Sequence, residues 1–196
     1  GNPKYVGARP VYRVDFLVGT HASLLTKFKA GRIDLLAQPT GDDLAKLTTP
    51  NLQVSPYWAT RLLVFNMRRP TVASAAFRRV ILHGLDRDAL PAFLKNGERR
   101  ATGLIPPGLP GYRELPLATR DPAQVQAALK QAPSAWKSTP IEVLTADLPA
   151  DRRVAQWLQA EIEKLGLRAR INSRPGSSFT QDLESGRYDL ALTTRS

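Results

Sequence analysis

The chain has 196 residues, no cysteine and a formal net charge of +11. Without cysteine there can be no disulfide, thiol catalysis or cysteine-ligated metal, and no apolar run approaches the roughly 20 residues of a membrane span. The charge is compatible with nucleic acid, anionic lipid or an acidic ligand. The basic residues are scattered in pairs with no block of five or six, however, which favours solvated faces over a nucleic-acid surface.

The first fifty residues are predicted to contain two strands and two helices. Residues 12–18 alternate with enough apolar content for a strand, and residues 33–37 read as a second one. Thr20 can cap a helix that ends at Gly31, and a short helix follows over about residues 40–47. The buried stripe of the first helix is expected to carry Leu24, Leu25 and Phe28.

The middle of the chain predicts a pair of strands followed by two helices. Residues 52–55 and 62–66 read as paired strands around the turn Pro56-Tyr57-Trp58. An amphipathic helix follows a Pro-containing turn, and Asp86 caps a second short helix. The buried face of the amphipathic helix is expected to carry Phe77, Val80, Ile81 and Leu85.

The remainder of the chain alternates helix and strand after an irregular segment. Residues 104–117 are rich in Pro and Gly and are expected to form a loop. Asp121-Pro122 opens a helix to about residue 130, and residues 151–165 form the strongest predicted helix, with Trp157 in the core. Strands are expected at residues 141–145, 167–171 and 188–193, with a further helix from Ser178. This alternation favours α/β architecture.

One short pattern occurs twice. The sequence GRIDL at residues 31–35 returns as GRYDL at residues 186–190, each time after an amphipathic helix and before a predicted strand. We expect the Gly to supply a left-handed turn and the Asp to help satisfy it, with no ligand role for either Asp.

The most specific motif of the chain is LLVFNMRRPTVASAAFRRVILHGLDRDAL, residues 62–90. It places a strand ending in Asn66 before an amphipathic helix and the Asp86-Arg87-Asp88 cap. This order resembles the peptide- and nickel-type solute-binding proteins of ABC transporters, solute-binding family five. The likeness runs from the Asn-Pro-Lys-Tyr segment at residues 2–5 to the Tyr-Asp step at residues 188–189, and so covers nearly the whole chain.

The resemblance implies an α/β fold, a lobe of the periplasmic-binding-protein type (type II) with a mixed sheet flanked by helices. Residues 1–196 would form a single lobe, the second of a two-lobe protein, with the first lobe and a C-terminal return segment absent. The whole protein would capture a peptide-like or other small polar solute by closing its lobes. It would then deliver the solute to an ABC permease, on the periplasmic or extracellular face of a bacterial membrane. We expect a monomer, no cofactor, no nucleic acid and no enzymatic activity.

Five side chains are candidates for ligand contact. His21 follows a predicted strand, where open α/β sheets present ligands and where the family's oligopeptide binders have a contact residue; an exposed helix-start role is the alternative. Tyr57 and Trp58 either form the apolar wall of a cleft or simply pack. Thr194 and Arg195 occupy the place of a ligand-site Trp in peptide-binding relatives. A cation there favours an anionic or carboxylate-bearing group, unless Arg195 is a frayed terminal residue.

Catalysis and metal binding find little support. The two histidines, His21 and His83, are far apart in the sequence, and there is no H-E-x-x-H, G-x-S-x-G or phosphate-binding glycine loop. His83 is expected to be structural or partly exposed. Two other functions stay open: the same lobe as the solute sensor of a transcriptional regulator, and a basic nucleic-acid-binding domain.

Overall fold

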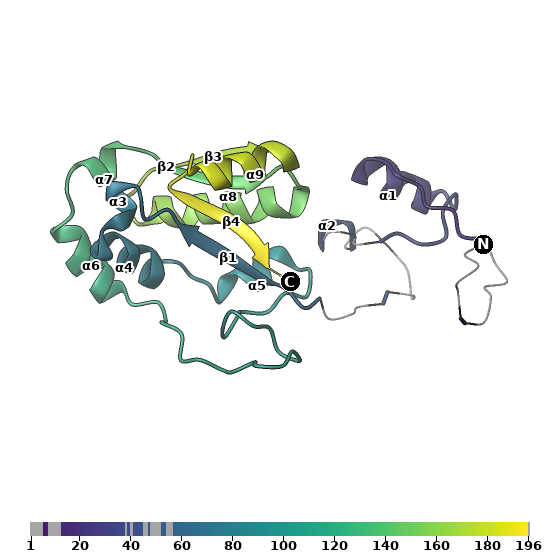
Figure 1. The fold of residues 1–196 in the computed structure, drawn as a ribbon, viewed down its shortest axis with the longest axis horizontal. Helices are drawn as coiled ribbons and strands as arrows, with labels where there is room; N and C mark the ends of the chain where they lie inside the picture. The colour runs from purple at the N-terminus through teal and green to yellow at the C-terminus, as the bar shows by residue number, and fades with distance from the viewer. Residues whose placement is uncertain are drawn as a thin grey trace. The chain divides into compact units, whose positions relative to one another are not determined.

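The computed structural model describes residues 6–7, 13–37, 39, 41–44, 47, 52–53 and 57–195. The chain divides into two compact units, Gly1–Thr49 and Pro50–Ser196. The helices and strands of both units carry the labels of Figure 1. That the whole chain acts as one lobe remains a prediction.

The N-terminal unit contains the helices α1 (His21–Lys29) and α2 (Gly41–Leu44). As predicted, Thr20 caps α1, because its Oγ1 accepts a hydrogen bond from the N–H of Ser23 at 3.4 Å. Gly31, with φ of 65°, follows the end of the helix. The predicted apolar stripe is only partly buried: Leu24, Leu25 and Phe28.

The strands predicted in this unit are wrong where the structure describes them. Neither residues 13–18 nor residues 33–37 form a strand, and residue 12, like residues 2–5 of the family motif, lies outside the described residues. Phe16 and Val18 are 90% and 94% exposed. An apolar alternation becomes a strand only when a neighbouring backbone pairs with it, and no described strand pairs with either segment.

The larger unit is built on one mixed sheet with strand order β1-β4-β2-β3. Its strands are β1 (Thr60–Phe65), β2 (Ile141–Ala146), β3 (Ala169–Arg174) and β4 (Leu190–Arg195). β2 is parallel to β3 and β4, whereas β1 is antiparallel to β4. The predicted pairing of β1 with residues 52–55 is wrong for residues 52–53, which are not a strand. Residues 54–55 lie outside the described residues.

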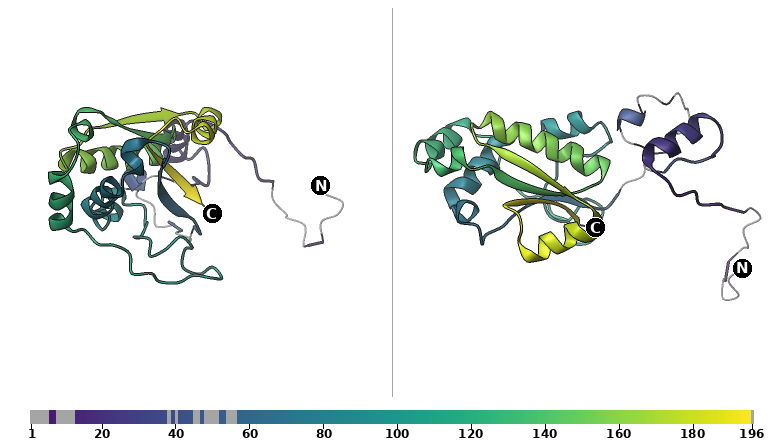
Figure 2. Two further views of the ribbon diagram at one scale, coloured as in Figure 1. Left: turned by 60° about the vertical axis from the view of Figure 1, so that its left-hand side comes forward. Right: turned by 90° about the horizontal axis from the view of Figure 1, so that it is seen from above.

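The two crossover helices cover opposite faces of this sheet. From β2 the chain crosses to β3 through α8 (Pro149–Lys164) and returns past β2 to β4 through α9 (Gly176–Ser185). Crossovers between parallel strands are almost always right-handed, so a reversal of direction moves the helix to the other face. The view from above shows α8 and α9 on the two sides of the sheet (Figure 2). The reversal creates a topological switch point between β2 and β4.

Five further helices precede β2 in the chain, most of them close to the predictions. They are α3 (Pro70–Ala73), α4 (Ala75–Gly84), α5 (Ala89–Leu94), α6 (Pro122–Lys130) and α7 (Ala135–Ser138). Asp121 caps α6 by accepting from the N–H groups of Ala123 and Gln124 at 3.0 and 3.1 Å. The hydrogen bonds from Gln124 hold the pKa of the Asp121 carboxyl below its ordinary value. Asp86 Oδ1 accepts from the N–H of Ala89 at the start of α5, as expected of a cap.

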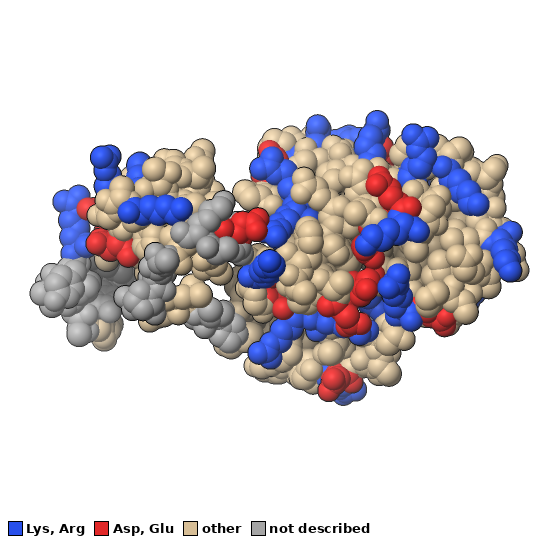
Figure 3. Space-filling view, turned by 180° about the vertical axis from the view of Figure 1, so that it is seen from behind, with Lys and Arg blue, Asp and Glu red and all other residues tan. Residues whose placement is uncertain are grey.

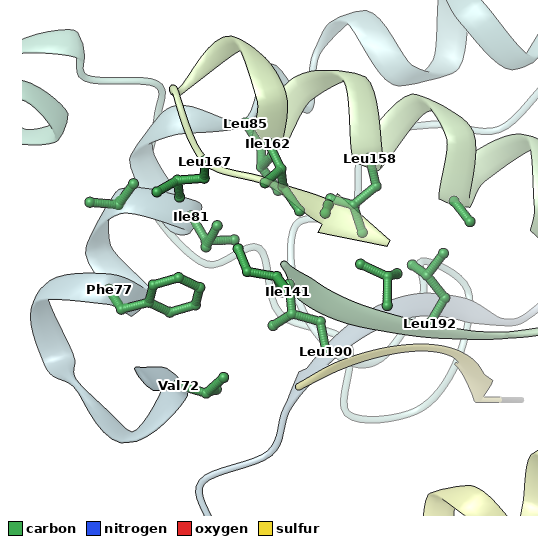
Figure 4. Packing of buried hydrophobic residues seen from close by; sticks show 14 of the residues in the cluster. Val72, Phe77, Ile81, Leu85, Ile141, Leu158, Ile162, Leu167, Leu190 and Leu192 are labelled. Atoms are coloured by element: carbon green, nitrogen blue, oxygen red, sulfur yellow. The ribbon is translucent and has the colours of Figure 1, made fainter. Parts of the chain in front are cut away.

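The main hydrophobic core lies between the sheet and the α4 and α8 helices (Figure 4). The predicted core face of α4 is confirmed, with Phe77 and Val80 fully buried. Trp136 of α7 is 5% exposed and meets Phe77 edge-on at 5.3 Å between ring centroids. Trp157, predicted in the core, is only partly buried at its margin. The aromatic partner of Phe77 thus comes from α7, a helix of four residues that is too short to show an apolar periodicity in the sequence.

A buried asparagine ends β1 and joins it to β4. Asn66 Nδ2 donates to the carbonyl oxygens of Gly186 and Tyr188 at 3.0 and 2.8 Å. Its Oδ1 accepts from the N–H of Arg68 at 3.1 Å. The amide thus satisfies three backbone groups at the point where two segments distant in sequence meet.

Asp189 completes this junction on the side of β2. Its carboxylate accepts from the N–H of Glu142 at 2.8 Å, and its own N–H donates to the carbonyl of Glu142 at 3.0 Å. Its carbonyl accepts from the N–H of Asn66 at 2.9 Å. One residue therefore links the end of β1 and the starts of β2 and β4. The sequence predicts that the Asp helps to satisfy the turn before it, whereas its carboxylate binds the neighbouring strand β2 instead.

A buried carboxylate, Asp182 on α9, holds the turn that leads into β4. Its Oδ1 accepts from Arg187 at 2.6 and 2.7 Å, and its Oδ2 pairs with Arg174 of β3 at 2.9 Å. The hydrogen bond from Arg187 lowers the pKa of the Asp182 carboxyl and outweighs the opposing effect of burial. The charged form is therefore the stabilising one.

Replacing Asn66 by Ala should destabilise the fold, because it leaves three backbone groups without their partner. We expect a loss of about 2 kcal/mol in the free energy of unfolding, measured by urea denaturation. Asn172→Ala in β3 is the control, since that side chain makes no hydrogen bond with the described residues. Equal losses in the two variants would contradict the role assigned to Asn66.

Replacing Asp182 by Asn should make stability less dependent on acid pH. The folded pKa of Asp182 lies below its unfolded value of about 3.9, so the stabilisation is complete above that value and disappears as the pH falls through the folded pKa. The difference in unfolding free energy between wild type and Asp182→Asn should shrink below about pH 4. Glu184→Gln, an exposed position on the same helix, should show no such convergence.

Candidate functional site

The candidate site is the edge of the sheet where β2, β3 and β4 end and β1 begins, here called the strand-end edge. These ends meet because β2, β3 and β4 run parallel and β1 runs antiparallel beside β4. In open α/β sheets, ligands bind outside the carboxyl ends of the strands at the topological switch point. That point lies here between β2 and β4.

Two aromatic side chains precede β1 at this edge. Tyr57 and Trp58 are 74% and 54% exposed. A tight turn, in which the N–H of Ala59 donates to the carbonyl of Tyr57 at 2.8 Å, leads into the strand. The next residue, Thr60, is buried and lies opposite Arg195 of β4. The register therefore brings together four of the five predicted site residues, those from the two segments 57–58 and 194–195.

The end of β4 carries a cation without a counter-charge among the residues that the structure describes. Thr194 lies opposite Arg61, whose guanidinium forms an ion pair with Asp151 in the first turn of α8. Arg195 is exposed and has no ion pair or hydrogen bond with the described residues. Since Arg195 is the last residue of β4 and pairs with Thr60, its backbone is held in the sheet. The structure thus argues against the interpretation of Arg195 as a frayed end.

One polar residue of this edge was not among the predicted site residues. Thr193 is 7% exposed, and its Oγ1 has no hydrogen-bond partner among the described residues. Buried hydroxyls are normally hydrogen-bonded, so this unpaired hydroxyl is an exception that lies two residues before Arg195 on the same strand. Sequence alternation alone could have shown that Thr193 and Thr194 face opposite sides of the sheet, although not which of the two is buried.

The acidic group nearest to the end of β2 is already engaged. Asp147 accepts a hydrogen bond from Ser173 Oγ at 3.0 Å and forms an ion pair with Arg152 at 3.2 Å. The strand-end edge therefore offers aromatic surface, hydroxyls and, at Arg195, a cation without an ion pair among the described residues. This combination suits a small polar molecule with an anionic group and an apolar part.

The two histidines make contacts within their own regions of the chain. His21 belongs to the N-terminal unit, where its Nε2 contacts the carboxylate of Asp43. His83 Nδ1 is 3.0 Å from the carbonyl oxygen of Thr119, a contact within the α4–α6 region. Among the described residues no group of three or more His, Asp or Glu side chains is arranged to hold a metal ion. A ligand role for His21 remains a prediction.

Two other surface features offer less to a solute than the strand-end edge. A groove of about 380 Å³ between α5 and α8 is lined by helix side chains, among them Phe93, Trp157 and Ala160. It has no strand end in its wall.

The surface charge is mixed. Figure 3 shows Lys and Arg scattered over the visible face with Asp and Glu between them. None of the described helices is both long and apolar enough to cross a membrane.

Comparison with known proteins identifies relatives along the whole chain. The sequence profile of the bacterial extracellular solute-binding proteins, family 5 Middle, matches residues 1–196. A probable di/tripeptide-binding protein 5 of Pseudomonas aeruginosa is 26% identical over 96% of this chain and 38% of its own length. The dipeptide-binding protein of Escherichia coli is 23% identical over 96% of this chain and 37% of its own. These relatives are binding proteins, and the chain spans less than two fifths of their length.

Solved structures confirm the predicted fold class, a lobe of the periplasmic-binding-protein type. NikA from Brucella suis, in complex with Fe(III)-EDTA, matches with a TM-score of 0.81 at 22% identity, over 97% of this chain and 43% of its own. A dipeptide-binding protein from Pseudoalteromonas sp. SM9913, in complex with Met-Leu, matches with a TM-score of 0.76 at 18% identity, over 90% and 37%. The mixed sheet with helices on both faces is common to these proteins and this chain.

Proposed function

Because this chain belongs to the bacterial extracellular solute-binding proteins, family 5, we propose that it serves as one lobe of the solute-binding component of an ABC importer. The whole protein captures a peptide-like or other small polar solute between two lobes and delivers it to a membrane permease, on the periplasmic or extracellular face. It works as a monomer, without cofactor, nucleic acid or catalytic step. The profile match over all 196 residues is the observation that carries this proposal.

The strand-end edge supports capture rather than chemistry. Three of its exposed side chains, Tyr57, Trp58 and Arg195, can hold a solute by contact and hydrogen bonding, and Thr194 offers a hydroxyl on the other face of β4. A solute bound at a single edge stays partly exposed to water. Water then competes with the protein for the hydrogen bonds of the solute's charged groups. Closure of a second lobe removes that water, strengthens each polar contact and completes the burial of the apolar part. Affinity therefore requires both lobes.

Calorimetry on the 196-residue chain and on the full-length protein that contains it tests whether tight binding requires both lobes. With the dipeptide alanyl-alanine as titrant, we expect micromolar or tighter binding by the full-length protein and binding at least about a hundredfold weaker by the chain alone. Equal, tight binding to both would contradict the proposal. A full-length sequence with a DNA-binding domain would point to a sensor instead of an importer.

The uncompensated charge of Arg195 should select for a carboxylate in the solute. In the full-length protein, Arg195→Gln should weaken binding of alanyl-alanine about tenfold or more, since a hydrogen bond to a charged group contributes about 1.5–3 kcal/mol. Binding of the C-terminal amide of the same dipeptide should change much less.

Arg68→Gln provides the matched control for this experiment. Arg68 is exposed and follows β1 at the opposite end of the sheet. It should leave the affinity for both forms of the dipeptide unchanged. A similar loss of affinity for the acid and the amide in Arg195→Gln would show that Arg195 does not bind the carboxylate.

A further inference from the structure

The Pro- and Gly-rich segment is an ordered loop that closes on itself. We call residues 102–115 the Pro–Gly loop. At its ends the N–H of Leu115 donates to the carbonyl of Thr102 at 3.0 Å, and the Thr102 and Tyr112 hydroxyls lie 3.0 Å apart. Within it, the N–H of Tyr112 donates to the carbonyl of Leu109 at 3.1 Å. Compact loops with closed ends hold a defined shape through their own contacts.

The family motif at residues 86–88 anchors the segment that follows this loop. Arg87 donates to the carbonyl of Ala118, and Arg100 donates to the same carbonyl at 3.3 Å. Arg100 also forms an ion pair with Asp88 at 2.8 Å. Burial, aided by the charge of Arg100, lowers the pKa of Arg87, as expected for a guanidinium withdrawn from water. The chain is thus held on both sides of the loop, at Arg100 and at Ala118.

The tip of the loop lies against Trp58. Gly108 has φ of 94°, and a Cβ built on it would come within 3.3 Å of the indole Nε1 and 4.0 Å of Cε2. The positive φ favours glycine here, and a Cβ at this position would make the indole shift by a few tenths of an ångström. The indole meets the loop with one side of its five-membered ring and is still 54% exposed.

The exposed part of this indole lies close to the site proposed above. Trp58 is two residues before Thr60, which sets a span of at most about 7 Å, and Thr60 pairs with Arg195. A dipeptide whose carboxylate meets Arg195 therefore has a side chain within reach of Trp58. Tyr57 adds a second exposed aromatic ring at this point.

We propose that the Pro–Gly loop sets the orientation of the Trp58 indole, so that the indole forms the wall that receives an apolar side chain of the solute. Gly108 is the positioning residue, and its lack of a Cβ is what allows the ring to rest there. The inference depends on the proposed function, solute capture at the strand-end edge. It adds the class of side chain that the site prefers, large and apolar, and the part of the chain that sets this preference.

A double-mutant cycle in the full-length protein tests the role of Gly108. The variants are Gly108→Ala, Trp58→Phe and the two combined, and the probes are alanyl-alanine and alanyl-phenylalanine, titrated by calorimetry. We expect wild type to bind alanyl-phenylalanine more tightly than alanyl-alanine. Gly108→Ala should reduce that preference about fivefold to tenfold, because the displaced indole no longer covers the phenyl ring.

The cycle separates displacement of the indole from backbone strain. Phenylalanine lacks the five-membered ring of the indole, which carries the two atoms that the new Cβ would meet, so Gly108→Ala should change the preference little in the Trp58→Phe background. The strain of a positive φ is the same in both backgrounds. Gly97→Ala is the control for strain alone, since Gly97 has φ of 84° and a Cβ at that position would meet nothing within 4 Å.

The outcomes distinguish this inference from the proposed function. Tight binding of both dipeptides with the preference unchanged in Gly108→Ala overturns the inference and leaves the proposed function intact. Absence of binding to either dipeptide in the wild type overturns both. If Gly108→Ala does not fold, Trp58→Ala decides alone, because it relieves the contact and adds no strain. A preference retained in Trp58→Ala then overturns the inference.

Discussion

The junction of Asn66 and Asp189 is the constraint on which the arrangement of the sheet depends. These two residues join the end of β1 to the starts of β2 and β4 by hydrogen bonds to backbone groups. Because side chains alternate along a strand, a shift of one residue between β1 and β4 would turn every side chain to the other face. The junction is therefore what sets the pairing of Thr60 with Arg195 at the far end.

The junction of Asn66 and Asp189 and the strand-end edge lie at opposite ends of the same strands, and their polar groups differ. Asn66 is buried, Asp189 is partly buried, and both side chains bind backbone groups, which leaves little polar capacity for a ligand at that end. At the strand-end edge, by contrast, Thr193 Oγ1 is buried without a partner and the Arg195 charge is uncompensated among the described residues. Groups left unsatisfied by the fold are those that a ligand can satisfy.

Many basic residues of this chain make ion pairs or hydrogen bonds within the fold. Many of its arginines serve the structure: Arg61 pairs with Asp151, Arg187 and Arg174 share Asp182, and Arg87 and Arg100 hold the carbonyl of Ala118. Arginine suits such roles because its planar guanidinium donates in several directions at once. The net charge of +11 is therefore a poor guide to the partner, whereas the position of single cations is informative.

Local sequence determined the elements with strong signals of their own. Caps at Thr20 and Asp121, the apolar face of α4 and the turn at Gly186 depend on near neighbours in the chain, and the motif at residues 62–90 identified the family. Only the tertiary structure decided which strands pair, that residues 13–18 remain unpaired, that Trp136 packs on Phe77, and that Gly108 meets Trp58. These features depend on contacts between segments far apart in the chain. A periodic pattern shows which side of an element is apolar, but it does not show what that side will meet.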